Sequence, residues 1–94
     1  MNYRQWLAEL YAALAEEAWK RYMANANQRL FIVADRGNVD GIFRNLRIET
    51  DASSADVVVN EHLPRCFTSY QLTRWVESRL RSQPIIDPAM WPTY

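Results

Sequence analysis

The chain has 94 residues with a formal net charge of zero, and 49% of its residues are hydrophobic. This length and composition predict one folded domain, residues 1–94, and exclude a disordered chain. A zero net charge argues against a general nucleic-acid binder, because such proteins usually carry a basic excess that neutralises phosphates. The single cysteine, Cys66, excludes a disulfide within the chain.

The N-terminal segment differs from that of a secreted protein. It begins an amphipathic helix that contains Glu9, Glu16 and Glu17, whereas a signal peptide has a uniformly apolar core. No stretch of the sequence approaches the apolar length needed to cross a bilayer. We therefore expect a cytoplasmic protein without membrane contact, in a bacterium or in a host that a phage has entered.

The first predicted element is a long helix between Asn2 and Ala26, a range without Gly, Pro or β-branched residues. Its core stripe, at steps of three and four, consists of Tyr3, Leu7, Leu10, Tyr11, Leu14, Ala18 and Tyr22. A second row, here called the alanine row, consists of Ala8, Ala12, Ala15 and Trp19. Its small side chains would let another helix approach closely, which predicts a partner surface, for example that of a homodimer. The alternative is that alanine merely favours helix and that Trp19 covers its own domain.

Three strands are predicted next, and their short links favour an antiparallel meander. The first, Leu30–Ala34, is a continuous apolar run, which is typical of a strand covered on both faces. The second runs from about Val39 to Thr50. Arg44 on its apolar side indicates a bulge or an edge position, and Gly41 indicates a bulge or a late start. The third, Asp56–Asn60, is built on three valines.

A second helix is predicted to begin at Thr68. Thr68 and Gln71 match a capping box, and Phe67 and Leu72 match the hydrophobic staple that often accompanies it. Its core stripe consists of Leu72, Trp75, Val76 and Leu80. Pro84 ends the helix. The cations that we expect to contact a partner are Arg74 and Arg79.

The last segment, residues 84–94, combines three prolines with large apolar side chains that disordered tails seldom carry. We expect it to lie extended against its own domain, or in a groove of a partner. The residues predicted to make these contacts with a partner are Met90, Trp91 and Tyr94.

No group of residues in the sequence matches a catalytic or metal site. His62 and Cys66 lie four residues apart in a loop around Pro64, a spacing that does not fix the geometry a nucleophile and its base require. One histidine and one cysteine cannot supply the four ligands of a zinc site. The two glycines are too few for a phosphate-binding loop. We expect no enzymatic activity, no metal and no cofactor.

The predicted fold class is α+β, with a long helix, a three-stranded antiparallel meander, a second helix and an extended tail. Both helices should cover one face of the sheet, because three strands alone bury too little surface. In size, absence of catalytic residues and strand–helix organisation, the chain between about Leu30 and Leu80 resembles the small inhibitors that phages and mobile elements deploy against host defence enzymes, such as anti-CRISPR proteins. Immunity proteins and secretion chaperones share this organisation.

Two functions follow from these observations. The first is non-catalytic protein binding, by an inhibitor or adaptor that occludes a surface of another protein or of a second copy. The alternative is a sheet-based nucleic-acid binder, with Phe31, Phe43 and Arg47 on an exposed face. Salt-sensitive retention on heparin or single-stranded DNA would favour the alternative.

Overall fold

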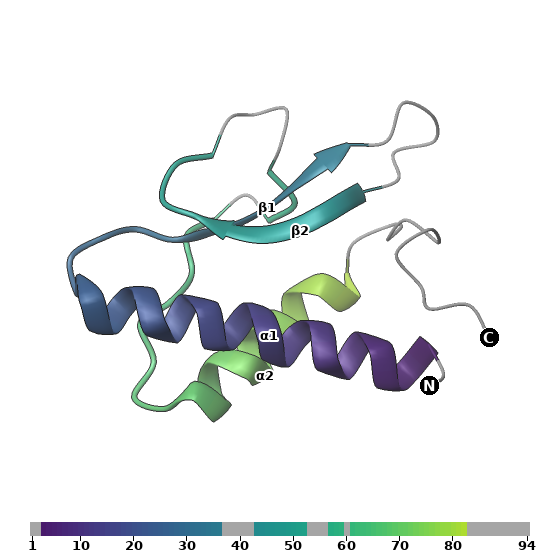
Figure 1. The fold of residues 1–94 in the computed structure, drawn as a ribbon, viewed down its shortest axis with the longest axis horizontal. Coiled ribbons are helices and arrows are strands. Elements are labelled where there is room, and N and C mark those ends of the chain that lie inside the picture. The colour runs from purple at the N-terminus through teal and green to yellow at the C-terminus, as the bar shows by residue number, and fades with distance from the viewer. Residues whose placement is uncertain (1–2, 37–42, 53–56, 60, 83–94) are drawn as a thin grey trace.

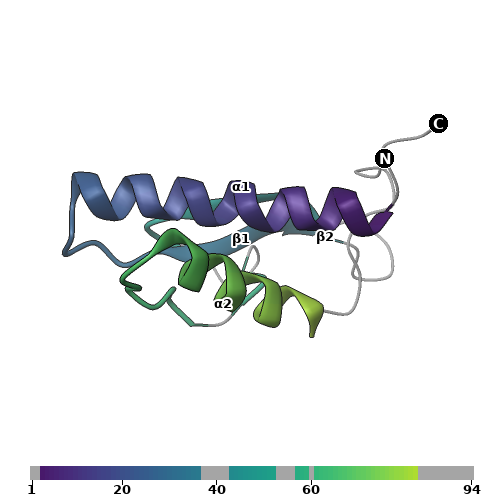
Figure 2. The same cartoon turned by 90° about the horizontal axis from the view of Figure 1, so that it is seen from below.

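The computed structural model describes residues 3–36, 43–52, 57–59 and 61–82 and shows an α+β fold (Figure 1). Its elements are α1 (Tyr3–Ala24), β1 (Phe31–Arg36), β2 (Phe43–Glu49) and α2 (Ser69–Arg81). β1 and β2 form a two-stranded antiparallel sheet. The two helices run in opposite directions and lie side by side on one face of that sheet, as expected (Figures 1 and 2).

The core lies between the helix pair and the sheet and uses the stripes that the sequence predicts. The buried members of the predicted α1 stripe are Tyr11, Leu14, Ala18 and Tyr22, with Leu7 and Leu10 partly buried beside them. Those from α2 are Leu72, Val76 and Leu80, with Trp75 partly buried. Because these positions recur at steps of three and four, each helix presents one apolar side to the sheet and to the other helix.

β1 is covered on both faces, as its continuous apolar run predicts. Ile32 is 0% exposed and Val33 is 1% exposed, and consecutive residues of a strand point to opposite faces. Ile32 belongs to the core beneath the helices, whereas Val33 lies outside that cluster. β1 also has neighbours on both edges, since β2 pairs along one edge and Val57 forms a bridge with Val33 on the other.

The structure does not show the predicted third strand, Asp56–Asn60. Residues 57–59 are described, and they form the single Val57–Val33 bridge instead of a ladder. Val58 and Val59 are both buried in the helix-covered core. Consecutive strand residues cannot point to the same face, so the chain must bend here, and the bend interrupts pairing. The bridge is also made to β1, whereas a meander would place this segment beside β2.

A bulge interrupts β2, as Arg44 indicated. Val33 pairs with Arg47 and Asp35 pairs with Arg44, so two residues of β2 lie opposite the single residue Ala34. One of these two, Asn45, has a φ of 52°. Asparagine tolerates this left-handed conformation better than most residues do. The extra residue shifts the alternation of the strand by one position.

The start of α2 confirms the predicted capping box. The Thr68 hydroxyl accepts from the Gln71 backbone N–H at 3.2 Å, and the Gln71 side-chain oxygen accepts from the Thr68 N–H at 3.3 Å. The same oxygen accepts from the Phe67 N–H at 2.9 Å. The predicted staple is wrong, because Phe67 is 93% exposed while Leu72 is fully buried in the core. The two side chains therefore do not contact each other as a staple requires.

Thr68→Ala should lower the free energy of unfolding by about 1 kcal/mol, because the Gln71 N–H loses its acceptor at the helix start. Chemical denaturation measures this change. Ser69→Ala is the matched control, since Ser69 is also exposed and lies one residue further along. An equal loss in both variants would show that the cap contributes no more than its neighbour.

Two further expectations concern the extended C-terminal segment and membrane-spanning helices. The predicted extended segment, 84–94, lies outside the described residues. Among the described residues, neither helix combines the length and apolar character needed to span a bilayer.

Candidate protein-binding surfaces

The alanine row is divided between the core and the surface. Ala15 is 0% exposed and Trp19 is partly buried against the core, whereas Ala8 and Ala12 are exposed. Ala8 lines a groove whose other wall belongs to α2. The helix that lies along this flank is therefore α2 of the same chain. Ala15 cannot contact a partner of the folded domain, which corrects the prediction at that position.

The two predicted cations of α2 have different surroundings. Arg74 is exposed. The Arg79 guanidinium lies 2.7 Å from a Glu61 carboxylate oxygen and 5.3 Å from the centre of the Trp75 ring. This ion pair joins α2 to the segment that precedes it, residues 61–68, here called the connector. The Glu61 carboxylate compensates part of the Arg79 charge. The other predicted contact residues, Met90, Trp91 and Tyr94, lie outside the described part of the chain.

Large exposed apolar side chains gather in one half of the molecule. Among the described residues, they are Phe67, which is 93% exposed, Tyr70, which is 69% exposed, and Met23, which is 60% exposed. Met23 lies in the last turn of α1, and the other two flank the start of α2. Both helix ends lie in the same half of the fold (Figures 1 and 2). We call these three residues the helix-end patch.

Two long-range hydrogen bonds join the end of α1 to residues 63–65, which precede α2. The Tyr22 hydroxyl donates to the Leu63 carbonyl at 2.8 Å. The Arg65 guanidinium donates to the Ala26 carbonyl at 2.8 Å. Because these bonds fix the connector to the end of α1, the patch belongs to an ordered surface. The patch could not be predicted while Phe67 matched a hydrophobic staple with Leu72. The signal for an exposed Phe67 was that Leu72 also belongs to the core stripe of α2.

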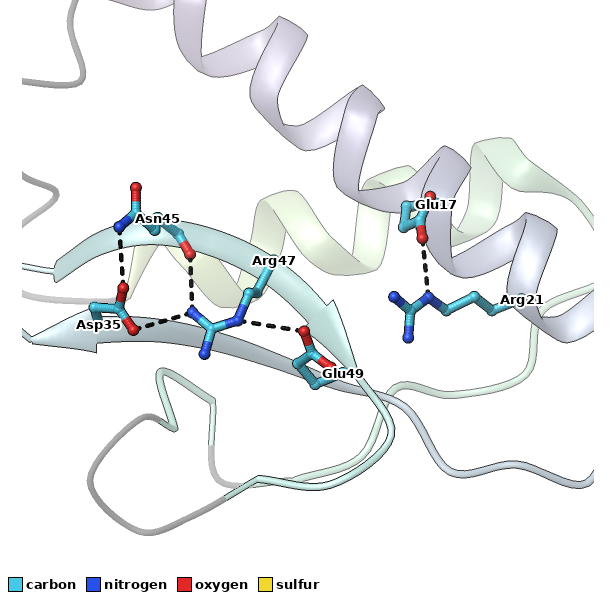
Figure 3. Close-up of polar contacts among 6 residues, drawn as sticks. All are labelled: Glu17, Arg21, Asp35, Asn45, Arg47 and Glu49. Atoms are coloured by element: carbon cyan, nitrogen blue, oxygen red, sulfur yellow. Dashed lines mark hydrogen bonds and ion pairs between the residues drawn. The ribbon is translucent and has the colours of Figure 1, made fainter.

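A charged cluster lies on the sheet at β1 and β2 (Figure 3). The Arg47 guanidinium lies 3.2 Å from an Asp35 oxygen and 3.3 Å from a Glu49 oxygen. Asn45 donates to Asp35 at 3.0 Å. This bond, and then the one from Arg47, lowers the pKa of the Asp35 carboxyl below its ordinary value. The cluster therefore places two acidic side chains against one basic side chain.

This charge balance bears on the predicted nucleic-acid face. Arg47 was the cation expected to contact phosphate, but two carboxylates already neutralise it, and they would repel a phosphate. Of the two expected stacking residues, Phe31 is half-buried, which leaves only part of its ring for a base. Phe43 begins β2, opposite Arg36 in the register.

The histidine and the cysteine make separate local contacts. His62 Nδ1 lies 3.3 Å from the Leu63 carbonyl oxygen, and the Cys66 thiol donates to the Pro64 carbonyl at 3.8 Å. Burial raises the pKa of the Cys66 thiol. A raised pKa lowers the thiolate fraction and with it the nucleophilicity of the sulfur. Across the described ranges, no three His, Cys, Asp or Glu side chains gather so that they could hold a metal ion.

No family model matches the chain, and no curated protein or solved structure matches it either.

Proposed function

We propose that this protein is a small non-catalytic protein-binding module, an inhibitor or adaptor that acts in the cytoplasm by occluding a surface of its partner. The observation that carries the proposal is the helix-end patch. Phe67, which is 93% exposed, and Tyr70, which is 69% exposed, are three residues apart at the ordered start of α2. Aromatic anchors of this kind often dominate the energy of protein interfaces.

The patch is suited to binding because its backbone is already ordered. Tyr70 lies in the first turn of α2, and the Phe67 N–H is bonded to the Gln71 side chain. A preorganised surface loses less conformational entropy on association than a loose one. Full burial of an exposed Phe side chain contributes roughly 1.5–3 kcal/mol. The two rings could thus supply a large share of the affinity of a moderate complex.

We further propose an anti-defence inhibitor of a phage or mobile element, such as an anti-CRISPR protein, as the concrete form of this function. Its support is the small size of the chain and its strand–helix organisation. The first partner to test is a second copy of this chain, because self-association can be measured before any host partner is known.

Replacing both aromatic residues, Phe67→Ser with Tyr70→Ser, should weaken association at least about tenfold, because the two rings together lose burial worth more than about 1.4 kcal/mol. Stability should change little, because both side chains are exposed. Sedimentation velocity over a range of concentrations measures self-association. Titration calorimetry measures binding to a host protein identified by co-purification from the native host.

Lys20→Ser is the matched control, because Lys20 is exposed on α1 and pairs with Glu16, one turn before it. It should leave both measurements as in the wild type. Unchanged affinity in the double variant would contradict the proposal. Salt-sensitive retention of the wild type on single-stranded DNA, lost in Arg47→Gln, would favour the nucleic-acid alternative.

A further inference from the structure

A second surface, independent of the helix-end patch, lies between the first half of α1 and the C-terminal part of α2. It is a groove of about 460 Å³ lined by Arg4, Leu7, Ala8, Tyr11, Glu77 and Arg81. Leu7 and Ala8, with the Tyr11 ring, supply apolar surface, and the charged residues come from both helices. Arg81 is paired with Glu77, one turn before it on α2, so the net charge of +1 at the groove is that of Arg4.

We propose that residues 83–94 of this chain bind in this groove. The first argument is position, because Arg81 is both the last residue of α2 and a residue that lines the groove. Ile85 follows Arg81 by four residues, a span of at most about 14 Å in an extended chain. The apolar residues of the segment therefore begin within reach of the Leu7 and Tyr11 side chains.

The second argument is the chemistry of the segment. Its large apolar residues are Ile85, Ile86, Met90, Trp91 and Tyr94, and its one charged side chain is Asp87. An acidic group directly after two isoleucines complements an apolar groove with a basic excess. The three prolines restrict the free segment, which lowers the entropy lost when it becomes ordered.

A thermal double-mutant cycle on the full chain tests this docking. Ile85→Ser with Ile86→Ser should lower Tm by about 4 °C or more, since about 1 kcal/mol corresponds to 4–8 °C in a domain of this size. In an Ala8→Tyr background the same pair should lower Tm by less than half as much, because the added ring occupies the groove without adding charge. In an Ala13→Tyr background the full loss should return.

Ala13 is the matched control because it is exposed on α1 and lines a different cleft, between α1 and β2. Non-additivity at Ala8 alone is the signature of direct contact, since distant sites add. Equal losses in all three backgrounds, or no loss in any, would overturn the proposal. A loss that grows with protein concentration, with a dimer in sedimentation, would place the segment in a second copy and would also overturn binding within the chain.

Discussion

Ala15→Arg should strongly destabilise the domain, whereas Ala12→Arg should leave its stability nearly unchanged. Ala15 is 0% exposed within the core, and Ala12 is exposed on the same helix. An arginine at position 15 would bury a permanent charge without a partner, which costs several kcal/mol. A domain of this size has roughly 5–15 kcal/mol of stability. We expect a loss of at least about 3 kcal/mol at Ala15 and less than about 0.5 kcal/mol at Ala12.

Circular dichroism during urea unfolding separates these two outcomes, and the substituted residue is the same in both variants. A cooperative transition at the wild-type midpoint for Ala15→Arg would contradict the packing of α1 described here. Unfolding by Ala12→Arg would show that this side of α1 is also core. A folded Ala12→Arg variant with weaker self-association would show that the exposed part of the alanine row contributes to a partner surface.

The elements that could be predicted from the sequence are those whose signals are local. The stripe that contains Leu14 and Tyr22 recurs at steps of three and four, which identifies a helix from the sequence alone. Any apolar surface that covers the stripe is sufficient to stabilise it. The capping box of Thr68 and Gln71 is contained within four residues, so tertiary packing had little opportunity to override it. Arg44 on the apolar side of the predicted strand indicated a bulge or an edge position, and the register shift opposite Ala34 shows the bulge.

The features that could not be predicted depend on which segment lies beside which. The alanine row predicts the close approach of some helix, but the spacing carries no information on whether α2 or another molecule supplies it. The three valines favour a strand by composition, yet the core takes both Val58 and Val59, which a straight strand cannot provide. Phe67 matched a staple locally, and only the tertiary structure shows it on the surface.

Tyr22→Phe should lower stability at neutral pH and should remove part of the loss that the wild type shows at high pH. The Tyr22 hydroxyl donates to the Leu63 carbonyl across 41 residues of sequence, and the tyrosine is buried. Removing the donor from this buried bond should cost about 1–3 kcal/mol. The same bond joins the end of α1 to Leu63. Its loss should therefore also make the segment before α2 less ordered.

The direction of the pH effect follows from the pKa of the phenol. Burial, and to a lesser degree the neighbouring Cys66, raises the pKa of Tyr22 from 10.0 to about 12, although Arg65 acts in the opposite direction. The folded state therefore holds this proton more tightly than the unfolded state. The contribution to stability is complete below pH 10 and is lost as the pH rises through about 12.

Chemical denaturation between pH 8 and pH 12 tests both parts of this prediction. The difference in free energy of unfolding between wild type and Tyr22→Phe should be largest at pH 8 and should shrink above pH 10, because only the wild type must lose this proton. Tyr70→Phe is the matched control, since it removes the hydroxyl of an exposed tyrosine and should follow the wild type throughout. A constant difference between wild type and Tyr22→Phe across this range would show that the phenol does not titrate with folding, and that the hydroxyl contributes only its neutral hydrogen bond to Leu63.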